Sequence, residues 1–361
     1  MFPPPPRCLD RERDASRLQS PPVATNLSDI WRGEHKMNVM KRKSSDVQTV
    51  LRNNINKDKL CIVQFPHPGQ EYPVCGTNAK LSNGVYEVDW SEMDSHYRRL
   101  IMHKGSYVDA NWKFHDGVEL VFWNEWEGPT TARDIKDQKN RISASFLHTV
   151  RYPKVSNASI YRGLCGASNC CFGRYGNLMN TDPCVFGTSF KYSICRQTPK
   201  GIMRRLAPGS LIIFGSRINC EFYLDTVFMV GDIAIDYRTG NDLKAMCSKE
   251  YKNLTVDRLP AGNYTFYRGI TPNGEKLLQE QCFSFVPARL SSMNSRSERC
   301  KVDLVQLNSI AQMKAFNVDV WRNKKASSAS AAQIISVWNE VVRQVTEQKF
   351  VLGVRFAWPK K

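Results

Sequence analysis

The sequence lacks long hydrophobic runs. Its longest apolar stretches, such as residues 211–214 and 226–230, are far shorter than the roughly 18 residues that a membrane-spanning helix needs. No apolar segment typical of secretory signals follows Met1. We therefore expect a protein without membrane spans that is located inside the cell, in the cytoplasm or the nucleus.

Acidic residues are scarce in one part of the chain. The whole sequence carries 51 Lys and Arg residues against 34 Asp and Glu residues, a net charge of +17. Residues 151–220 hold ten basic residues and a single acid, Asp182, and so contribute +9. A field of this sign favours phosphate-bearing partners and speeds their association. The charge predicts a nucleic acid or nucleotide as partner, although a general role in solubility would give the same excess.

The cysteines lack the spacing of a zinc site. Twelve cysteines are present, and five of them fall within positions 165–195 without a C-x2-C pair or a histidine. We predict no metal and, because no export signal is seen, reduced thiols instead of a disulfide framework. No cofactor is predicted either, because no dinucleotide-binding or P-loop glycine pattern occurs. An activated nucleophilic thiol is the remaining alternative, with Cys195 as its candidate.

Short runs of β-branched and aromatic residues indicate a β-rich fold. The strongest pair is 210–215 with 222–230, and Asp116 with Gly117 is the favoured dipeptide of a hairpin turn between 108–114 and 118–127. Apolar residues recur at three and four over 331–348, which predicts a helix. Further strands are expected at 60–65, 263–268, 282–286 and 350–356. The predicted class is α+β and β-rich, with a mixed or antiparallel sheet, a C-terminal helix and a final strand.

Three regions are predicted along the chain. Residues 1–55 form a basic N-terminal arm, disordered over its proline-rich and charged first 20 residues and with one or two short helices in 27–54. Residues 56–235 form a β-rich ligand-binding core. Residues 236–361 form an α+β region that packs on this core.

The stretches 208–215 and 224–230 resemble the turn-strand-strand element of PUA-like barrels, including ASCH-type domains. The resemblance covers about 25 residues of the chain. It implies a partly open barrel and binding of RNA or of modified bases. It assigns no individual residue.

One predicted strand combines aromatic and acidic residues, at positions 122–127. Alternation places Trp123, Glu125 and Glu127 on one face, with Trp126 on the other. Two carboxylates about 7 Å apart in a partly dry site raise at least one pKa, which suits general acid/base chemistry or contacts to a ribose or base edge. The alternative is an edge strand with solvated glutamates and with tryptophans in the core.

A second candidate segment, residues 161–176, combines four glycines with Arg162, Arg174 and Tyr175. Glycines let backbone N–H groups converge on an anion, arginines supply bidentate donors, and tyrosines offer stacking faces. A structural loop without a ligand would show the same composition. Further along, Asp182 either contacts a substrate or an arginine, or stabilises a turn before Pro183.

Together these patterns favour an intracellular protein that binds a nucleic acid or nucleotide. The first alternative is an enzyme acting on a nucleotide or sugar substrate, a hydrolase or glycosyl transferase, and the second is a protein-interaction scaffold. The catalytic candidates of the enzyme alternative are Glu125 and Glu127. The predicted ligand-binding residues are Trp123, Trp126, Arg151, Arg162, Arg174, Tyr175, Asp182 and Arg196.

Overall fold

The computed structural model describes part of the chain. The described residues are 60–71, 80–82, 85–87, 97–126, 131–134, 147–151, 182–193, 195, 197, 201–218, 221–235, 247–254, 265–272, 281–291, 299–317 and 325–358. All of them belong to one compact unit, Asp46–Lys361. The predicted N-terminal arm, its helices in 27–54 and the glycine- and arginine-rich segment 161–176 lie outside the described residues.

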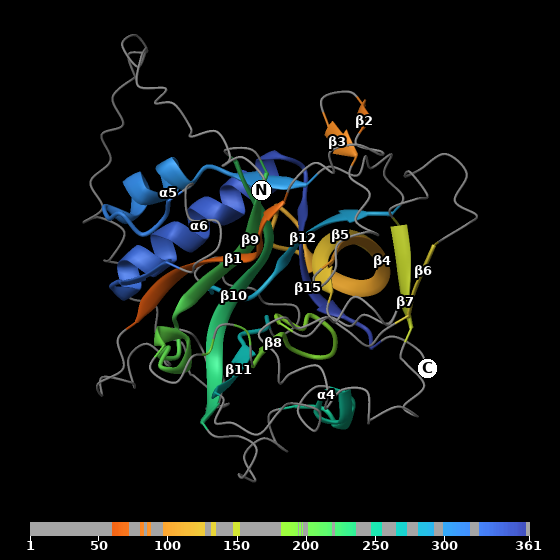
Figure 1. The fold of residues 1–361 in the computed structure, drawn as a ribbon, viewed down its shortest axis with the longest axis horizontal. Helices are drawn as coiled ribbons and strands as arrows, with labels where there is room; N and C mark the ends of the chain where they lie inside the picture. The colour runs from red at the N-terminus through yellow and green to blue at the C-terminus, as the bar shows by residue number, and fades with distance from the viewer. Residues whose placement is uncertain are drawn as a thin grey trace, which may run out of the picture. The chain divides into compact units, whose positions relative to one another are not determined.

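The larger sheet has the strand order β14-β1-β9-β10-β11-β8, and β13 also pairs with β10 (Figure 1). Strands β1 and β9 run parallel, whereas the other pairs are antiparallel, so the sheet is mixed. Its strands are β1 (Cys61–Glu71), β8 (Lys191–Tyr192), β9 (Leu211–Ile218), β10 (Glu221–Ile235), β11 (Thr265–Gly269), β13 (Cys300–Val302) and β14 (Lys325–Ser328).

The second sheet contains a closed barrel of four strands. Its order is β15-β12-β5-β4-β7-β6, and β15 also pairs with β4, which closes a ring of β4, β5, β12 and β15. Its strands are β4 (Tyr97–Val108), β5 (Phe114–Trp126), β6 (Thr131–Asp134), β7 (Leu147–Arg151), β12 (Val286–Leu290) and β15 (Val351–Phe356). A separate hairpin joins β2 (Lys80–Ser82) and β3 (Val85–Glu87).

The longest described helix is α6 (Ala331–Glu347), as the apolar periodicity predicts. Its first turn is a capping box, in which Ser330 Oγ accepts from Gln333 N and Gln333 Oε1 accepts from Ser330 N. The other helices are α4 (Lys249–Leu254), α5 (Leu304–Ala311) and the 3-10 turn η4 (Ile202–Arg204). No helix in the described part of the chain is both long enough and apolar enough to cross a membrane.

Alternation along the strands separates two hydrophobic clusters. On β1, Ile62 belongs to the cluster that contains the apolar faces of α5 and α6, whereas Val63 belongs to the cluster that contains the barrel interior. Helices α5 and α6 therefore lie on one face of the larger sheet (Figure 1), and buried residues of the barrel strands contribute to both clusters. Trp338 on α6 is fully buried in the cluster that contains the helices, and its Nε1 donates to Phe283 O at 2.9 Å.

The β-rich prediction is confirmed, with β9, β10, β11, β15 and α6 at the predicted places within a few residues. Strand β12 begins later than predicted, at Val286. Strands from the predicted core 56–235 and from the predicted region 236–361 share both sheets. The boundary between those two regions stays a prediction.

The strand predicted at 60–65 is longer in the structure and includes residues 66–69. Strand β1 continues through these residues to Glu71, with an irregularity between Pro66 and Gln70 in its pairing with β9. The prolines are tolerated because β14 pairs only with residues 61–64, so that the missing N–H groups break no ladder bond to β14.

The predicted Asp-Gly hairpin turn is also misplaced. The chain reverses at residues 109–113, where the Asp109 carboxylate accepts from Asn111 N and Lys113 N, both at 2.9 Å. Asp116 and Gly117 instead lie within β5, at a register shift against β4. Gly117 has a φ of +72°, so the glycine serves a bulge and not a turn.

Trp338 provides a test of this packing. Replacing Trp338 with Ala removes a fully buried side chain and its hydrogen bond, and we expect the free energy of unfolding to fall by about 3–5 kcal/mol. Val305 on α5 is 70% exposed, so Val305→Ala should change the free energy of unfolding by less than about 0.5 kcal/mol. Urea unfolding followed by circular dichroism measures both. Equal losses in the two variants would contradict the assignment of the core.

A candidate anion-binding cavity

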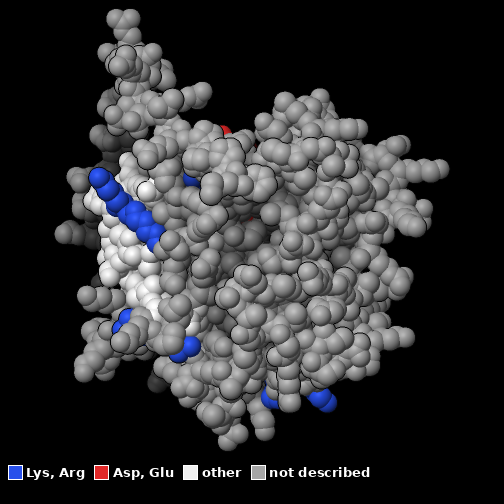
Figure 2. Space-filling view, in the orientation of Figure 1, with Lys and Arg blue, Asp and Glu red and all other residues white. Residues whose placement is uncertain are grey.

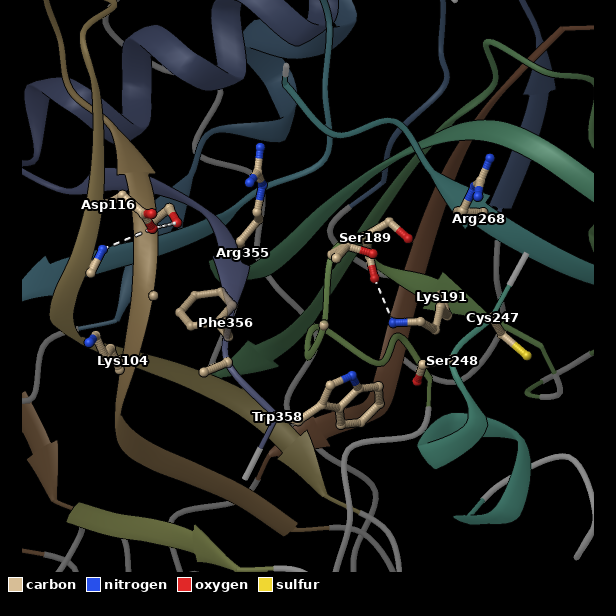
Figure 3. A pocket seen from close by; sticks show the side chains of 16 residues that line it. Lys104, Asp116, Ser189, Lys191, Cys247, Ser248, Arg268, Arg355, Phe356 and Trp358 are labelled. Atoms are coloured by element: carbon tan, nitrogen blue, oxygen red, sulfur yellow. Dashed lines mark hydrogen bonds between the residues drawn. The ribbon is translucent and has the colours of Figure 1, made fainter. Parts of the chain in front are cut away.

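A cavity of about 630 Å³ opens beside the end of the barrel (Figure 3). Its lining comes from six separate parts of the chain: 104–106, 116–117, 187–189 with Lys191, 247–248, Arg268 and 355–358. The volume falls within the range of small-molecule sites, about 300–1,000 Å³. Its lining includes five charged side chains, so we take this cavity as the candidate site.

The wall formed by residues 356–358 is fixed by hydrogen bonds on both sides. Gly187 N donates to Phe356 O at 2.8 Å, and Ala357 N donates to Lys104 O at 2.9 Å. His103 Nε2 donates to Ala357 O at 2.8 Å. The end of β15 is thereby held between β4 and the segment that contains Gly187.

Gly105 allows this close approach. A Cβ at Gly105 would clash with the backbone oxygen of Arg355 and would lie 2.9 Å from the Phe356 ring. Any larger residue would force β15 away from β4 and open the barrel at the edge of the cavity. The glycine thus sets the position of Phe356, whose side chain is 1% exposed.

Lys191 is the most unusual charge of the site, because it is only 2% exposed. Its Nζ donates to Phe186 O at 2.6 Å and to Ser189 O at 2.7 Å, and it lies 4.9 Å from the centre of the Trp358 ring. Within the described residues, no carboxylate forms a salt bridge with it. Burial lowers the pKa of Lys191. The two carbonyls and the indole are neighbours that favour the charged form of an amine.

Three further cations reach the cavity. Arg355 is half-buried and donates to Pro272 O at 3.1 Å, while its Nε has no partner among the described residues. Lys104 is exposed, and Arg268 forms an ion pair with Asp232. The one carboxylate of the lining is Asp116, which accepts from Ser106 Oγ at 2.5 Å. That hydrogen bond lowers the pKa of Asp116 and keeps it ionised.

The lining therefore holds four cations and one anion. On the face shown in Figure 2, the described Lys and Arg side chains lie at separate places and do not merge into one patch. In the cavity four cations share one lining, and Lys191 among them is buried, where electrostatic interactions are less screened than in water. Such a cavity favours a ligand with negative charge.

Aromatic rings form the floor between the charged groups. Figure 3 shows Phe356 and Trp358 between the side chains of Lys104 and Lys191. The Trp358 ring is half-buried and stands 6.3 Å from the ring of Phe186. A half-buried indole offers a flat face on which a planar ring can stack.

The structure places the predicted Trp123 elsewhere. Trp123 is half-buried on β5, between the buried Phe122 and Asn124, so the predicted alternation is confirmed for these residues. The guanidinium of Arg299 lies 5.7 Å from its ring and forms a buried ion pair with Asp225 at 3.0 Å. Trp123 is not among the residues that line the cavity.

Asp182 is buried and bound to backbone amides. Its Oδ1 accepts from Ser193 N at 2.8 Å and its Oδ2 accepts from Cys195 N at 2.6 Å. These bonds join Asp182, which precedes Lys191 in the chain, to Ser193 and Cys195, which follow Lys191. Both bonds reach residues more than ten positions away, so they differ from the local turn before Pro183 that the sequence suggests.

The other predicted site residues cannot be placed against the cavity. Arg151 lies at the end of β7, and Glu125 and Trp126 at the end of β5, with side chains outside the described residues. Glu127, Arg162, Arg174, Tyr175 and Arg196 lie outside the described residues altogether. Among the described residues, no group of three or more His, Cys, Asp or Glu side chains could hold a metal ion.

The sequence analysis missed Lys191, Arg355 and Trp358. For Lys191 a signal exists, because a lysine stands between Phe190 and Tyr192 in a run that otherwise reads as a buried strand. Comparison with protein-family models, with curated proteins and with solved structures gives no match. The geometry of the cavity is therefore the main basis for a functional conclusion.

His103 makes the wall of the cavity sensitive to pH. Burial lowers the pKa of His103 below its ordinary value of 6.5. As the pH falls below about 6.5, the unfolded chain takes up the proton before the folded protein does, so the free energy of unfolding must decrease. His103→Gln keeps a donor for Ala357 O but does not titrate. We expect its stability to fall less than that of the wild type between pH 7 and 5 in urea unfolding experiments, and parallel pH profiles would contradict this account.

Proposed function

We propose that the protein binds a nucleotide, or one nucleotide of a nucleic acid, in the cavity next to the barrel. The observation that carries this proposal is the buried Lys191, whose ammonium has carbonyl and aromatic neighbours but no carboxylate within the described residues. A buried charge without a counter-charge is costly, and a bound anion removes that cost.

The remaining features support a ligand that joins an anion to a planar ring. Trp358 supplies a stacking face next to Lys191, and Arg355 adds a half-buried guanidinium to the lining. A phosphate on a nucleoside combines these two properties in one molecule. The excess of basic residues in 151–220 supports the same partner class.

The likeness of the β9–β10 region to PUA-like barrels also belongs to this proposal. These two strands follow the turn at Pro208 and Gly209 and pair antiparallel in the larger sheet, outside the four-strand barrel. The resemblance favours RNA or a modified base as the source of the nucleotide. An intracellular location is part of the same proposal.

Calorimetric titration tests the proposal with adenosine 5′-monophosphate and with a short single-stranded RNA. We expect both to bind, with an RNA affinity that falls steeply between about 50 and 200 mM salt because counterions are released. Arg355→Met keeps much of the side chain's apolar volume but removes the charge, and it should weaken binding about tenfold or more.

The matched control is Arg343→Met. Arg343 lies on α6, where it pairs with Glu340 and Glu347, and it does not line the cavity. This variant should bind like the wild type. Absence of binding to both ligands in the wild type, or equal weakening in the two variants, would refute the proposed function.

A further inference from the structure

We propose that the turn at residues 187–191 is the anion subsite of this cavity and holds the phosphate group of the ligand. The inference rests on the proposed function and specifies where the charged part of the nucleotide binds. It follows from the hydrogen-bonding groups of the turn, from the position of Lys191 below it, and from the location of the only lining carboxylate.

The turn carries donors that are not used inside the protein. Within the described part of the chain, the backbone N–H groups and the hydroxyls of Thr188 and Ser189 donate no hydrogen bond. Ser189 is nevertheless only 8% exposed. Thr188 is exposed, so the burial argument concerns Ser189. Backbone N–H groups at buried positions almost always have an acceptor, so a ligand oxygen is the natural partner for the Ser189 amide.

Lys191 adds a charge directly beneath these donors. Its Nζ binds Ser189 O at 2.7 Å, which places the ammonium under the turn (Figure 3). An ammonium group has three N–H donors, and the carbonyls of Phe186 and Ser189 use two of them. The third donor remains for a ligand, together with a net charge that the carbonyls and the rings of Trp358 and Tyr251 stabilise but do not neutralise.

Gly187 lets the backbone of the turn approach both the ammonium group of Lys191 and the indole of Trp358. It has a φ of +96°, which favours glycine, and a Cβ there would lie 2.8 Å from Trp358 Nε1 and 3.0 Å from Lys191 Nζ. Consecutive backbone N–H groups in a turn next to a cation form a concave anion site, and the three terminal oxygens of a phosphate match such convergent donors.

The lining carboxylate lies at the other end of the cavity. Figure 3 shows Asp116 and Lys104 on one side of Phe356, and Ser189 and Lys191 on the other. Asp116 would repel a phosphate at its own end, where it offsets the charge of Lys104 and Arg355. The end formed by the turn has no carboxylate in its lining, so a phosphate is favoured there.

Two titrations test the subsite. In the wild type, adenosine 5′-monophosphate should bind at least about tenfold more tightly than adenosine. In Lys191→Met this ratio should fall to near one, because the phosphate loses its main charge partner. Lys113→Met, at an exposed lysine on the β4–β5 loop outside the cavity, is the matched control and should keep the wild-type ratio.

A second measurement does not depend on the folding of a variant. In ¹H–¹⁵N spectra of the wild-type protein, inorganic phosphate should move the amide signals of Thr188 and Ser189 more than those of Gly105 and Gly117 at the other end. An unchanged ratio in a folded Lys191→Met variant, or phosphate shifts confined to Gly105 and Gly117, would overturn the subsite and leave the proposed function standing. Failure of the wild type to bind adenosine 5′-monophosphate, adenosine or phosphate would overturn both.

Discussion

The pairing of β15 with β4 is the constraint on which the cavity depends. Strand β15 also pairs with β12, so this second pairing closes the four-strand barrel and fixes where β15 ends. The chain beyond it, residues 356–358, is then bound between Lys104 and Gly187. Without Gly105 the two strands could not approach so closely, and Trp358 would not stand over Lys191.

Electrostatic balance then turns this geometry into a prediction of function. Two other buried charges of the described chain are balanced within the protein, because Arg299 pairs with Asp225 and Asp182 accepts from two backbone amides. Lys191 instead has two carbonyl oxygens and an aromatic face, which stabilise an ammonium group but do not neutralise it. A protein can keep such a charge at low cost if an anion binds beside it.

The fold was more predictable than the site, for physical reasons. Strands β9 and β10 and helix α6 can be predicted from the sequence, because their burial requires a pattern of apolar residues along consecutive positions. The Asp116–Gly117 pair gave a wrong prediction of a hairpin turn, because a glycine with a positive φ occurs in bulges as well as in turns. The pairing of β5 with β4 decides between the two. The cavity joins residues up to about 250 positions apart, and no local pattern connects Lys104 with Arg355.

The central claim is that the buried charge of Lys191 is balanced by a ligand anion. A crystal structure determined with adenosine 5′-monophosphate tests it most directly, because it shows the neighbours of Lys191 Nζ. The account predicts a phosphate oxygen within hydrogen-bond distance of that atom and of the Thr188 or Ser189 amide, with the base against Trp358. A carboxylate of the protein itself within about 4 Å of Lys191 Nζ, with the nucleotide absent from the cavity, would contradict it.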